Sequence, residues 1–365
     1  MGSGKAVFIH GAELERFRYP PEHPFRPERA AMTFQLAQSM GLLSGEGIEL
    51  AAPTTATRED LERFHSARYL DALARADEGH LDIDALQMGI GTPDCPAFRG
   101  MYAYAALACG GTLLGARRIL AGEAQVAFNP SGGYHHAQPE LASGFCYIND
   151  QALACLALAS TGKRVLYLDA DAHHGDGVQN AFYDRADVMT ISFHESGRTL
   201  WPGTGFEDEI GTGEGRGYSV NVPLPAGTHD EAYLEAFREI ALPLLGAFRP
   251  DVISLELGLD GLAGDPLTHL ALSDAVHAEI VARVLECGCP VLATGGGGYQ
   301  VENTVRGWTR IWGVLVRRAA STGEEGKGPK RGISPREKEL RRRVEAGVRE
   351  TIRAVKANVF AIHGL

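Results

Sequence analysis

The sequence contains few cysteines and no long apolar run. Its six cysteines form no Cys-x-x-Cys pair and no apolar signal segment opens the chain, so we expect reduced thiols and a cytoplasmic protein. No stretch approaches the roughly 18 apolar residues that a membrane-spanning helix requires. Ala6 stands where an N-myristoylation signal has Ser or Thr, which argues against a lipid anchor.

Positive charge is scarce outside the C-terminal tail. The net charge of the 365 residues is −11, but Val316 to Leu365 carry 13 Lys and Arg against 6 acidic residues, or +7, which leaves −18 for the remainder. An acidic body disfavours nucleic acid as the main partner and mildly favours cationic ligands. The composition, 44% hydrophobic and 22% charged, is that of a globular protein long enough to bury a large core.

Short apolar runs recur along the chain, each followed by a loop rich in glycine and polar residues and then by a helical pattern. This alternation predicts an α/β domain with a central, mainly parallel sheet flanked by helices. Ligands of such sheets bind beyond the carboxyl ends of the strands, so we treat the polar loops as one site. The expected strands are Lys5 to Ile9, Gln125 to Phe128, Val165 to Leu168, Val188 to Phe193, Val252 to Leu257 and Val291 to Thr294; the expected helices include Glu28 to Met40, Arg58 to Ala76 and Met101 to Leu120, and the turn-rich segment Gly89 to Cys95 is expected to be exposed.

The chain divides by composition into a body, residues 1–318, a linker, residues 319–333, and a C-terminal helix, residues 334–365. The linker is rich in Ser, Gly, Lys and Glu, and Ser334 with Glu337 has the form of a capping box. Because the helix carries an apolar stripe, we expect it to dock on its own domain, although its basic face leaves binding of a partner open. The stripe consists of Leu340, Val344, Val348, Ile352, Val355 and Val359.

Polar side chains follow the apolar run Val165 to Leu168. Asp169, Asp171 and His173 are spaced by two, so in an extended chain their side chains point to one side. Carboxylates gathered in a buried place need compensation, and Asp260 offers a further oxygen ligand at the end of another strand. This set suits Zn²⁺ in an open catalytic site, or a harder ion such as Fe²⁺ or Mn²⁺. The alternative is a solvated polar strand end, with His174 merely packed.

The pair His135 and His136 follows the strand Gln125 to Phe128. An isolated His-His pair is more often structural than catalytic. Next to a metal, however, adjacent imidazoles can act as the base that activates water and the acid that protonates a leaving group. Asp169 and Asp176 are the carboxylates available to orient them, one for each histidine.

The run Gly295 to Gly298 precedes Tyr299. It lacks the Lys-Ser or Lys-Thr of a phosphate loop and the spacing of a dinucleotide fingerprint, so a nucleotide site is not expected. Four glycines permit backbone conformations that would bring Tyr299 close to a cavity, where its hydroxyl would donate to an oxyanion. The alternative is an ordinary aromatic residue packed at a strand end.

Seven segments of the sequence share their order and residue pattern with a known family. They are PSGGYHHA, SGFCYIND, YLDADAHHGDGVQNAF, WPGTGF, GYSVNVPLP, LGLDGLAGDPL and GGGGY. In these segments the chain resembles the histone deacetylase family, most of all its class I branch and the bacterial acetoin-utilisation deacetylases. The resemblance covers roughly Ile9 to Trp312 and implies an arginase-like α/β fold and a zinc-dependent hydrolase of acetyl-lysine.

The resemblance also implies roles for individual residues. The metal ligands would be Asp171, His173 and Asp260; the general acid/base pair would be His135 and His136, backed by Asp169 and Asp176; and Tyr299 would be the oxyanion donor. Substrate would be bound by Asp94 at the rim and by Gly144, Phe145, Trp201 and Leu267 along the acyl-lysine tunnel. A potassium ion would be held by Asp169, Asp171, His173, Ser192 and Phe193, partly through backbone oxygens.

Three positions depart from the family pattern. Trp201 falls where the family commonly has Phe, Leu259 replaces a common Ala, and Glu256 stands where Gln is frequent. These departures put the acyl-chain preference and the local electrostatics in doubt, but they remove no catalytic group.

Three other functions compete with protein lysine deacetylation. A deacetylase of acetylated polyamines or other small amines would use the same core, and the rim residue Asp94 favours peptide substrates over these only modestly. A manganese ureohydrolase would need a second set of bridging carboxylates, which we do not find in the sequence. A non-catalytic acyl-lysine binder with a basic recruiting tail is disfavoured by the intact set of catalytic residues.

Overall fold

The computed structural model describes residues 5–317 and 334–365. Eight strands form one sheet in the order β2-β1-β3-β8-β7-β4-β5-β6, and each neighbouring pair is parallel. The parallel α/β architecture predicted from the alternation of strands and helices is therefore confirmed. The strands are β1 (Ala6–Ile9), β2 (Ile48–Ala51), β3 (Val126–Asn129), β4 (Val165–Asp169), β5 (Val188–Glu195), β6 (Ser219–Leu224), β7 (Val252–Glu256) and β8 (Val291–Thr294).

Both faces of the sheet are apolar and covered by helices. Along β4, Leu166 and Leu168 belong to one core cluster and Val165 and Tyr167 to another, as the two-residue period of a strand requires. The first cluster lies under α1 (Glu28–Ser39), α8 (Asp230–Ala236), α9 (Leu242–Phe248), α10 (Asp274–Glu286) and α11 (Val301–Leu315), and the second under α5 (Met101–Leu120), α6 (Asp150–Ala159) and α7 (Asp176–Ala181).

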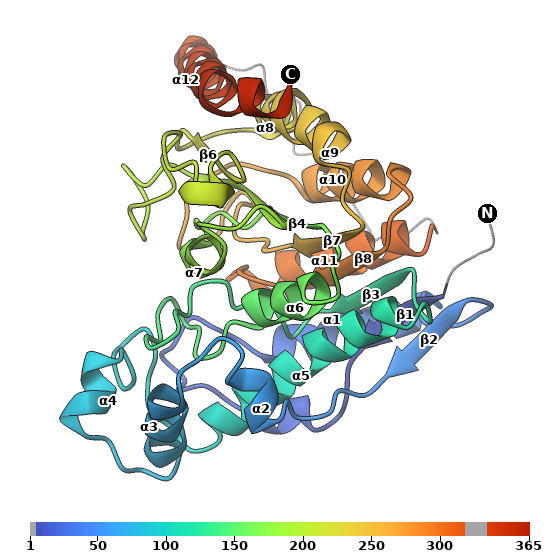
Figure 1. Cartoon of the computed structure of the whole chain (residues 1–365). Helices are drawn as coiled ribbons and strands as arrows, with labels where there is room; N and C mark the ends of the chain where they lie inside the picture. Colours follow the sequence, from blue (N-terminus) through green and yellow to red (C-terminus); the bar gives the residue numbers. More distant parts are fainter. Residues whose placement is uncertain (1–4, 318–333) are drawn as a thin grey trace.

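A third apolar cluster lies to one side of the sheet. It joins α2 (Arg58–Leu61), α3 (Ala67–Asp77) and α4 (Ile83–Gln87) to the first half of α5, and these short helices gather at one end of the molecule (Figure 1). Single turns of other helix types complete the described elements: η1 (Leu14–Arg16), η2 (Gly213–Gly215), η3 (Phe237–Ala241) and η4 (Phe360–His363).

Several elements differ from the sequence-based expectation. The prediction of a single helix over Arg58 to Ala76 is wrong, because α2 ends at Leu61 and α3 begins at Ala67. The Ser66 side chain caps α3 by accepting the N–H of Tyr69. The segment Gly89 to Cys95 is not uniformly exposed, since Ile90 and Cys95 are buried. Strands β2 and β6 were not predicted. In contrast, the helix Met101–Leu120 and the strand Val291–Thr294 have the predicted bounds.

The C-terminal helix α12 (Pro335–Val359) docks against β6 and α8, at the end of the molecule opposite α2 to α4 (Figure 1). Its capping box between Ser334 and Glu337 forms as predicted. Thr351 Oγ1 donates to Pro223 O at 2.9 Å, so the helix satisfies a carbonyl on the edge strand. Leu340 is 58% exposed, so the predicted stripe is wrong at this position. The predicted linker, residues 319–333, lies outside the described residues.

Candidate active site

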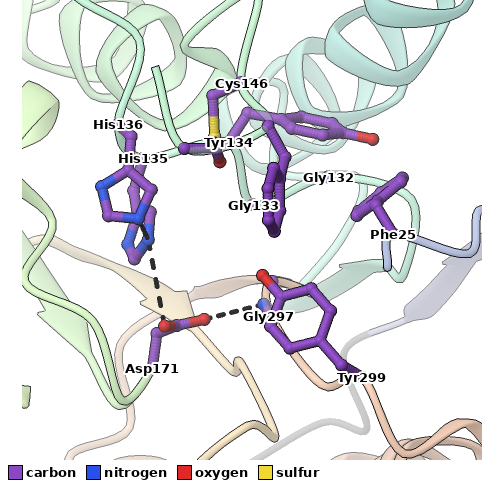
Figure 2. Close-up of a pocket in the computed structure, with 13 residues that line it drawn as sticks. Phe25, Gly132, Gly133, Tyr134, His135, His136, Cys146, Asp171, Gly297 and Tyr299 are labelled. Atoms are coloured by element: carbon purple, nitrogen blue, oxygen red, sulfur yellow. Dashed lines mark hydrogen bonds and ion pairs between the residues drawn. The ribbon is translucent and has the colours of Figure 1, made fainter. Parts of the chain in front are cut away.

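Four neighbouring strands at the centre of the sheet, β3, β8, β7 and β4, end at one edge. The loops that follow β3, β4 and β8 line a cavity (Figure 2). Of the polar loops that the sequence suggested as one site, these three meet here. The cavity is lined by Phe25, Gly132, Gly133, Tyr134, His135, His136, Gly144, Phe145, Cys146, Asp171, Gly296, Gly297 and Tyr299.

Asp171 lines this cavity at its floor, and His173 and Asp260 lie beside Asp171. His173 Nδ1 lies 2.8 Å from Asp260 Oδ2 and 3.3 Å from Asp171 Oδ1, and one ligand atom from each residue lies within 4.8 Å of the others. The extended-chain argument for Asp169 does not hold, because β4 ends at this residue and the chain then turns. Asp169 Oδ1 instead accepts the N–H of Asp171 at 3.0 Å.

The charge of these carboxylates exceeds that of the single imidazole. Burial lowers the pKa of His173, but Asp260 and Asp171 outweigh this effect and raise the pKa to about 10. Burial and the charge of Asp171 together raise the pKa of Asp260 to about 7. The cluster thus holds protons that a divalent cation would displace, and two carboxylates with one imidazole are a donor set that fits such an ion.

Glycines let the backbone approach the carboxylates closely. The N–H of Gly297 donates to Asp171 Oδ2 at 2.7 Å. A Cβ at Gly297 would lie 2.2 Å from Asp260 Oδ2, and a Cβ at Gly258 would lie 1.8 Å from Asp171 Oδ2. The run Gly295 to Gly298 therefore supports the acidic side chains as well as leading to Tyr299.

The two adjacent histidines are each paired with a different carboxylate. His135 Nδ1 lies 2.9 Å from Asp169 Oδ2, and His136 Nδ1 lies 2.8 Å from Asp176 Oδ1. Their Nε2 atoms are 2.9 Å apart, so one of them donates to the other. These are the pairs that the sequence suggested. Both imidazoles lie on the same side of the cavity, facing Asp171 (Figure 2).

The environment makes the two imidazoles unequal. Burial opposes a charge on His135, but Asp169, Asp171 and Glu256 outweigh it and hold its pKa well above the usual range. Burial and the neighbouring His135 lower the pKa of His136 to about 4. A proton shared between the Nε2 atoms therefore belongs to His135, which leaves His136 neutral.

Glu256 is a buried carboxyl group that sequence reasoning did not place in the site. Its Oε2 accepts from Gln151 Nε2 at 2.6 Å, whereas its Oε1 has no hydrogen-bond partner and lies 3.9 Å from His135 Nδ1. Burial raises the pKa of Glu256 well above its usual range.

A second possible set of metal ligands consists of His135, Asp171 and Glu256. The sequence had not suggested such a set. However, both nitrogen atoms of His135 already contact Asp169 and His136, which leaves no lone pair directed to an ion between these residues. The set Asp171, His173 and Asp260 is the better candidate.

Tyr299 lies across the cavity from the histidines, and its hydroxyl faces the space above Asp171 (Figure 2). Its backbone N–H donates to Asp265 Oδ2 at 2.7 Å, and Arg29 donates to the carbonyls of Gly296 and Gly298 in the preceding loop. Burial and the nearby Asp260 and Asp171 hold the pKa of Tyr299 well above its usual range, so the hydroxyl keeps its proton. It is available as a hydrogen-bond donor.

Gly144 and Phe145 line the cavity from a tight turn. Both have positive φ, 53° and 68°, between the bridged residues Ser143 and Cys146, which is the backbone form of a tight hairpin. The glycine has no space for a side chain, since a Cβ would lie 2.4 Å from His136 and 2.6 Å from Trp201.

Trp201 faces this turn and stacks edge-on against His136, with ring centroids 4.6 Å apart. It is 43% exposed. Asp94 is also exposed, and its carbonyl oxygen lies 3.2 Å from Nε2 of His23, whose ring packs against Phe145. The N–H of Leu267 donates to Asp265, which also holds Tyr299.

The residues expected to bind potassium lie at the end of β4, in the loop that follows it and on the adjacent strand β5. Ser192 on β5 is in register with Asp169 on β4, and Phe193 follows it in the core. Ser192 Oγ contacts His194 Nδ1 at 2.8 Å.

Sequence reasoning missed several residues that position the site. Tyr167 OH donates to Asp169 Oδ2 at 2.7 Å, and Gln151 holds Glu256. The role of Arg29 could not be predicted, because this residue lies in a helix far from the glycine run in sequence. Only Tyr167 could have been noticed, because it is a polar residue within an apolar strand.

Fold and site together define a hydrolase of the arginase and deacetylase type, with a candidate metal centre at the carboxyl edge of a parallel sheet. A model of the histone deacetylase domain matches residues 23–315, and the chain belongs to the histone deacetylase family. It is an enzyme of the metal-dependent deacetylase class, which removes acetyl groups from amides.

Curated relatives include bacterial and eukaryotic proteins. The chain is 42% identical to the acetoin utilization protein AcuC of Bacillus subtilis, over 84% of this chain and 81% of that protein. It is 39% identical to histone deacetylase 8 of Xenopus tropicalis, over 87% and 85%. The crystal structure of a histone deacetylase homologue from Aquifex aeolicus matches with a TM-score of 0.84 at 32% identity and covers 96% of this chain and 100% of that one. Within the described ranges, no helix is long and apolar enough to cross a membrane.

Proposed function

We propose that this deacetylase removes acetyl groups from lysine side chains of proteins and uses a divalent ion, Zn²⁺ or alternatively Fe²⁺, held by Asp171, His173 and Asp260. The observation that carries the proposal is the meeting of these three side chains with a carboxylate-backed histidine pair and Tyr299 around one cavity. Each of these groups has a task in the hydrolysis of an amide.

The ion would act as a Lewis acid toward the acyl carbonyl and would make water more acidic. One member of the His135 and His136 pair takes a proton from the attacking water, and a protonated imidazole of the pair later gives a proton to the leaving amine. Asp169 and Asp176 orient the two rings and stabilise the positive charge that they gain. The products are acetate and a free amine.

Tyr299 donates its hydroxyl proton in a hydrogen bond to the oxygen of the acyl carbonyl as that oxygen gains charge. Its raised pKa and its backbone anchor at Asp265 keep the donor protonated and in place. A single donor of this kind typically contributes about 10²–10³ in kcat.

The acylated side chain enters between Phe145 and Trp201, whose aromatic rings provide apolar walls for its methylene groups. Asp94, exposed at the rim, receives N–H groups of the substrate backbone, and Leu267 packs beside the entrance. We further propose that residues 1–318 form the catalytic domain and that K⁺ binds near Asp169, Asp171, His173, Ser192 and Phe193.

Comparison of an acetyl-lysine peptide with N-acetylputrescine at equal concentration tests the substrate class. Acetate release should be faster from the peptide, because only the peptide offers a backbone to Asp94. Replacement of Asp94 by Asn should raise KM for the peptide but not for N-acetylputrescine, so the rates of acetate release from the two substrates should become more similar. Faster hydrolysis of N-acetylputrescine, unaffected by D94N, would assign the enzyme to small acetylated amines.

A further inference from the structure

Glu195, the last residue of β5, is a buried carboxylate outside the catalytic groups described above. Its side chain has 0% exposure. Oε2 accepts the backbone N–H of His269 at 2.8 Å, and Oε1 accepts from His269 Nδ1 and from Thr199 Oγ1, both at 2.9 Å. A buried carboxylate requires such donors. The Glu195 side chain and its donors, His269 and Thr199, therefore hold one another in position.

The partners of Glu195 belong to two different loops. Thr199 lies in residues 196–206, which follow β5 and carry Trp201, and His269 lies in residues 257–272, which follow β7 and carry Asp260 and Leu267. The backbone N–H of Glu195 donates to Ala172 O at 2.9 Å, between the candidate ligands Asp171 and His173. Glu195 therefore joins both loops to the floor of the site.

Both loops contact the site directly. Trp201 stacks on His136, and Thr268, the neighbour of His269, donates through Oγ1 to Asp260 O at 2.5 Å. In the second loop, Asp265 accepts the N–H groups of Leu267 and Tyr299. A displacement of His269 would therefore move the loop that carries Leu267, and a displacement of Thr199 would move the loop that carries Trp201.

We propose that Glu195 and His269 form a junction that fixes the spacing between the Trp201 and Leu267 sides of the entrance and thereby sets the affinity for the acylated side chain. Both residues are positioning residues, since they act through Trp201 and Leu267. The inference rests on the proposed function in that the entrance receives an acylated lysine.

His269→Ala is the preferred test, because this side chain is 64% exposed and its loss does not threaten folding. KM for an acetyl-lysine peptide should rise about tenfold, the lower limit expected for one lost hydrogen bond to a charged group, while kcat changes little. His269→Asn should restore much of the affinity, because its amide can donate to Glu195. Glu195→Gln, which keeps the shape but removes one acceptor, should resemble His269→Ala.

Acrylamide quenching of tryptophan fluorescence tests the junction without any substrate. Trp308 and Trp312 are buried, so the accessible signal comes from Trp201. His269→Ala should make Trp201 easier to quench, and His269→Asn should return it toward the parent value. Because this readout is independent of turnover, it separates failure of the junction from failure of the proposed substrate.

A matched control is the pair His229 and Glu231 at the start of α8, in which Nδ1 and Oε2 are 2.8 Å apart, against 2.9 Å for His269 Nδ1 and Glu195 Oε1. Glu231→Gln should change neither KM nor quenching. Unchanged KM and unchanged quenching in both His269→Ala and Glu195→Gln would overturn the proposal. So would equal losses in kcat and kcat/KM that His269→Asn fails to restore, since a purely structural role would produce that result.

Discussion

The floor and the entrance of the site are held in place by different means. At the floor, Asp171 and Asp260 accept backbone N–H groups from Gly297 and Ala172, and the strands that carry them are neighbours in register. At the entrance, Trp201 is partly exposed and is positioned by packing and by side-chain bonds such as those of Glu195. The floor therefore depends on close backbone contacts at loop glycines such as Gly258 and Gly297, whereas the entrance depends on the side chains of two loops.

Tyr299→Phe should have the largest effect among variants that leave the candidate ligands intact. The donor to the developing oxyanion is lost while the ring and its Asp265 anchor remain, so kcat should fall about 10²–10³-fold. KM should change little. Steady-state kinetics with an acetyl-lysine peptide provides the measurement, and a variant with full kcat would remove Tyr299 from the chemistry.

Gly258→Ala tests how tightly the floor is packed. A Cβ there would lie 1.8 Å from Asp171 Oδ2, so the carboxylate must move, and a displacement near 1 Å can cost about 10²-fold in rate. Gly246→Ala is the matched control, because a Cβ at this position in α9 meets nothing within 4 Å. Parent-like kcat in Gly258→Ala would mean that the floor tolerates movement.

Two buried histidines, one inside the floor and one outside it, differ in how burial affects their pKa. His173 at the floor is paired with carboxylates, whereas burial lowers the pKa of His65, beside α3, to about 4. Its unfolded pKa is about 6.5, so the unfolded chain binds the extra proton between these values and stability falls as pH decreases from about 6.5 to 4, by at most about 3 kcal/mol. Stability above pH 6.5 is unaffected by this group.

Urea unfolding of the parent and of His65→Gln at pH 7.5 and pH 5 measures this contribution. The glutamine variant should lose less stability between the two pH values than the parent does. An equal loss in both proteins would show that His65 is not responsible.

The sequence was sufficient to predict the floor and much less of the entrance. Asp171, His173 and Asp260 follow apolar strands, and the parallel sheet brings strand ends together, so the pattern suggested that they meet. The same pattern also placed Asp169 with them, and only the resemblance to the family separated it from the ligands. The unequal pKa values of His135 and His136 depend on Glu256 and Asp169, whose positions require the register of β7 and β4. The junction at Glu195 could not be predicted, because it joins loops that are 74 residues apart in the chain.

The most direct test of the central claim is a metal titration of the chelated protein that follows both ion binding and acetate release, with Asp171→Asn as the comparison. The account predicts that the metal-free parent is inactive, that about one equivalent of Zn²⁺ per chain restores turnover, and that Asp171→Asn keeps its fold but binds the ion much more weakly and stays inactive. Acetate release that persists after complete chelation, or restoration of Asp171→Asn to parent activity by the same equivalent of ion, would contradict it.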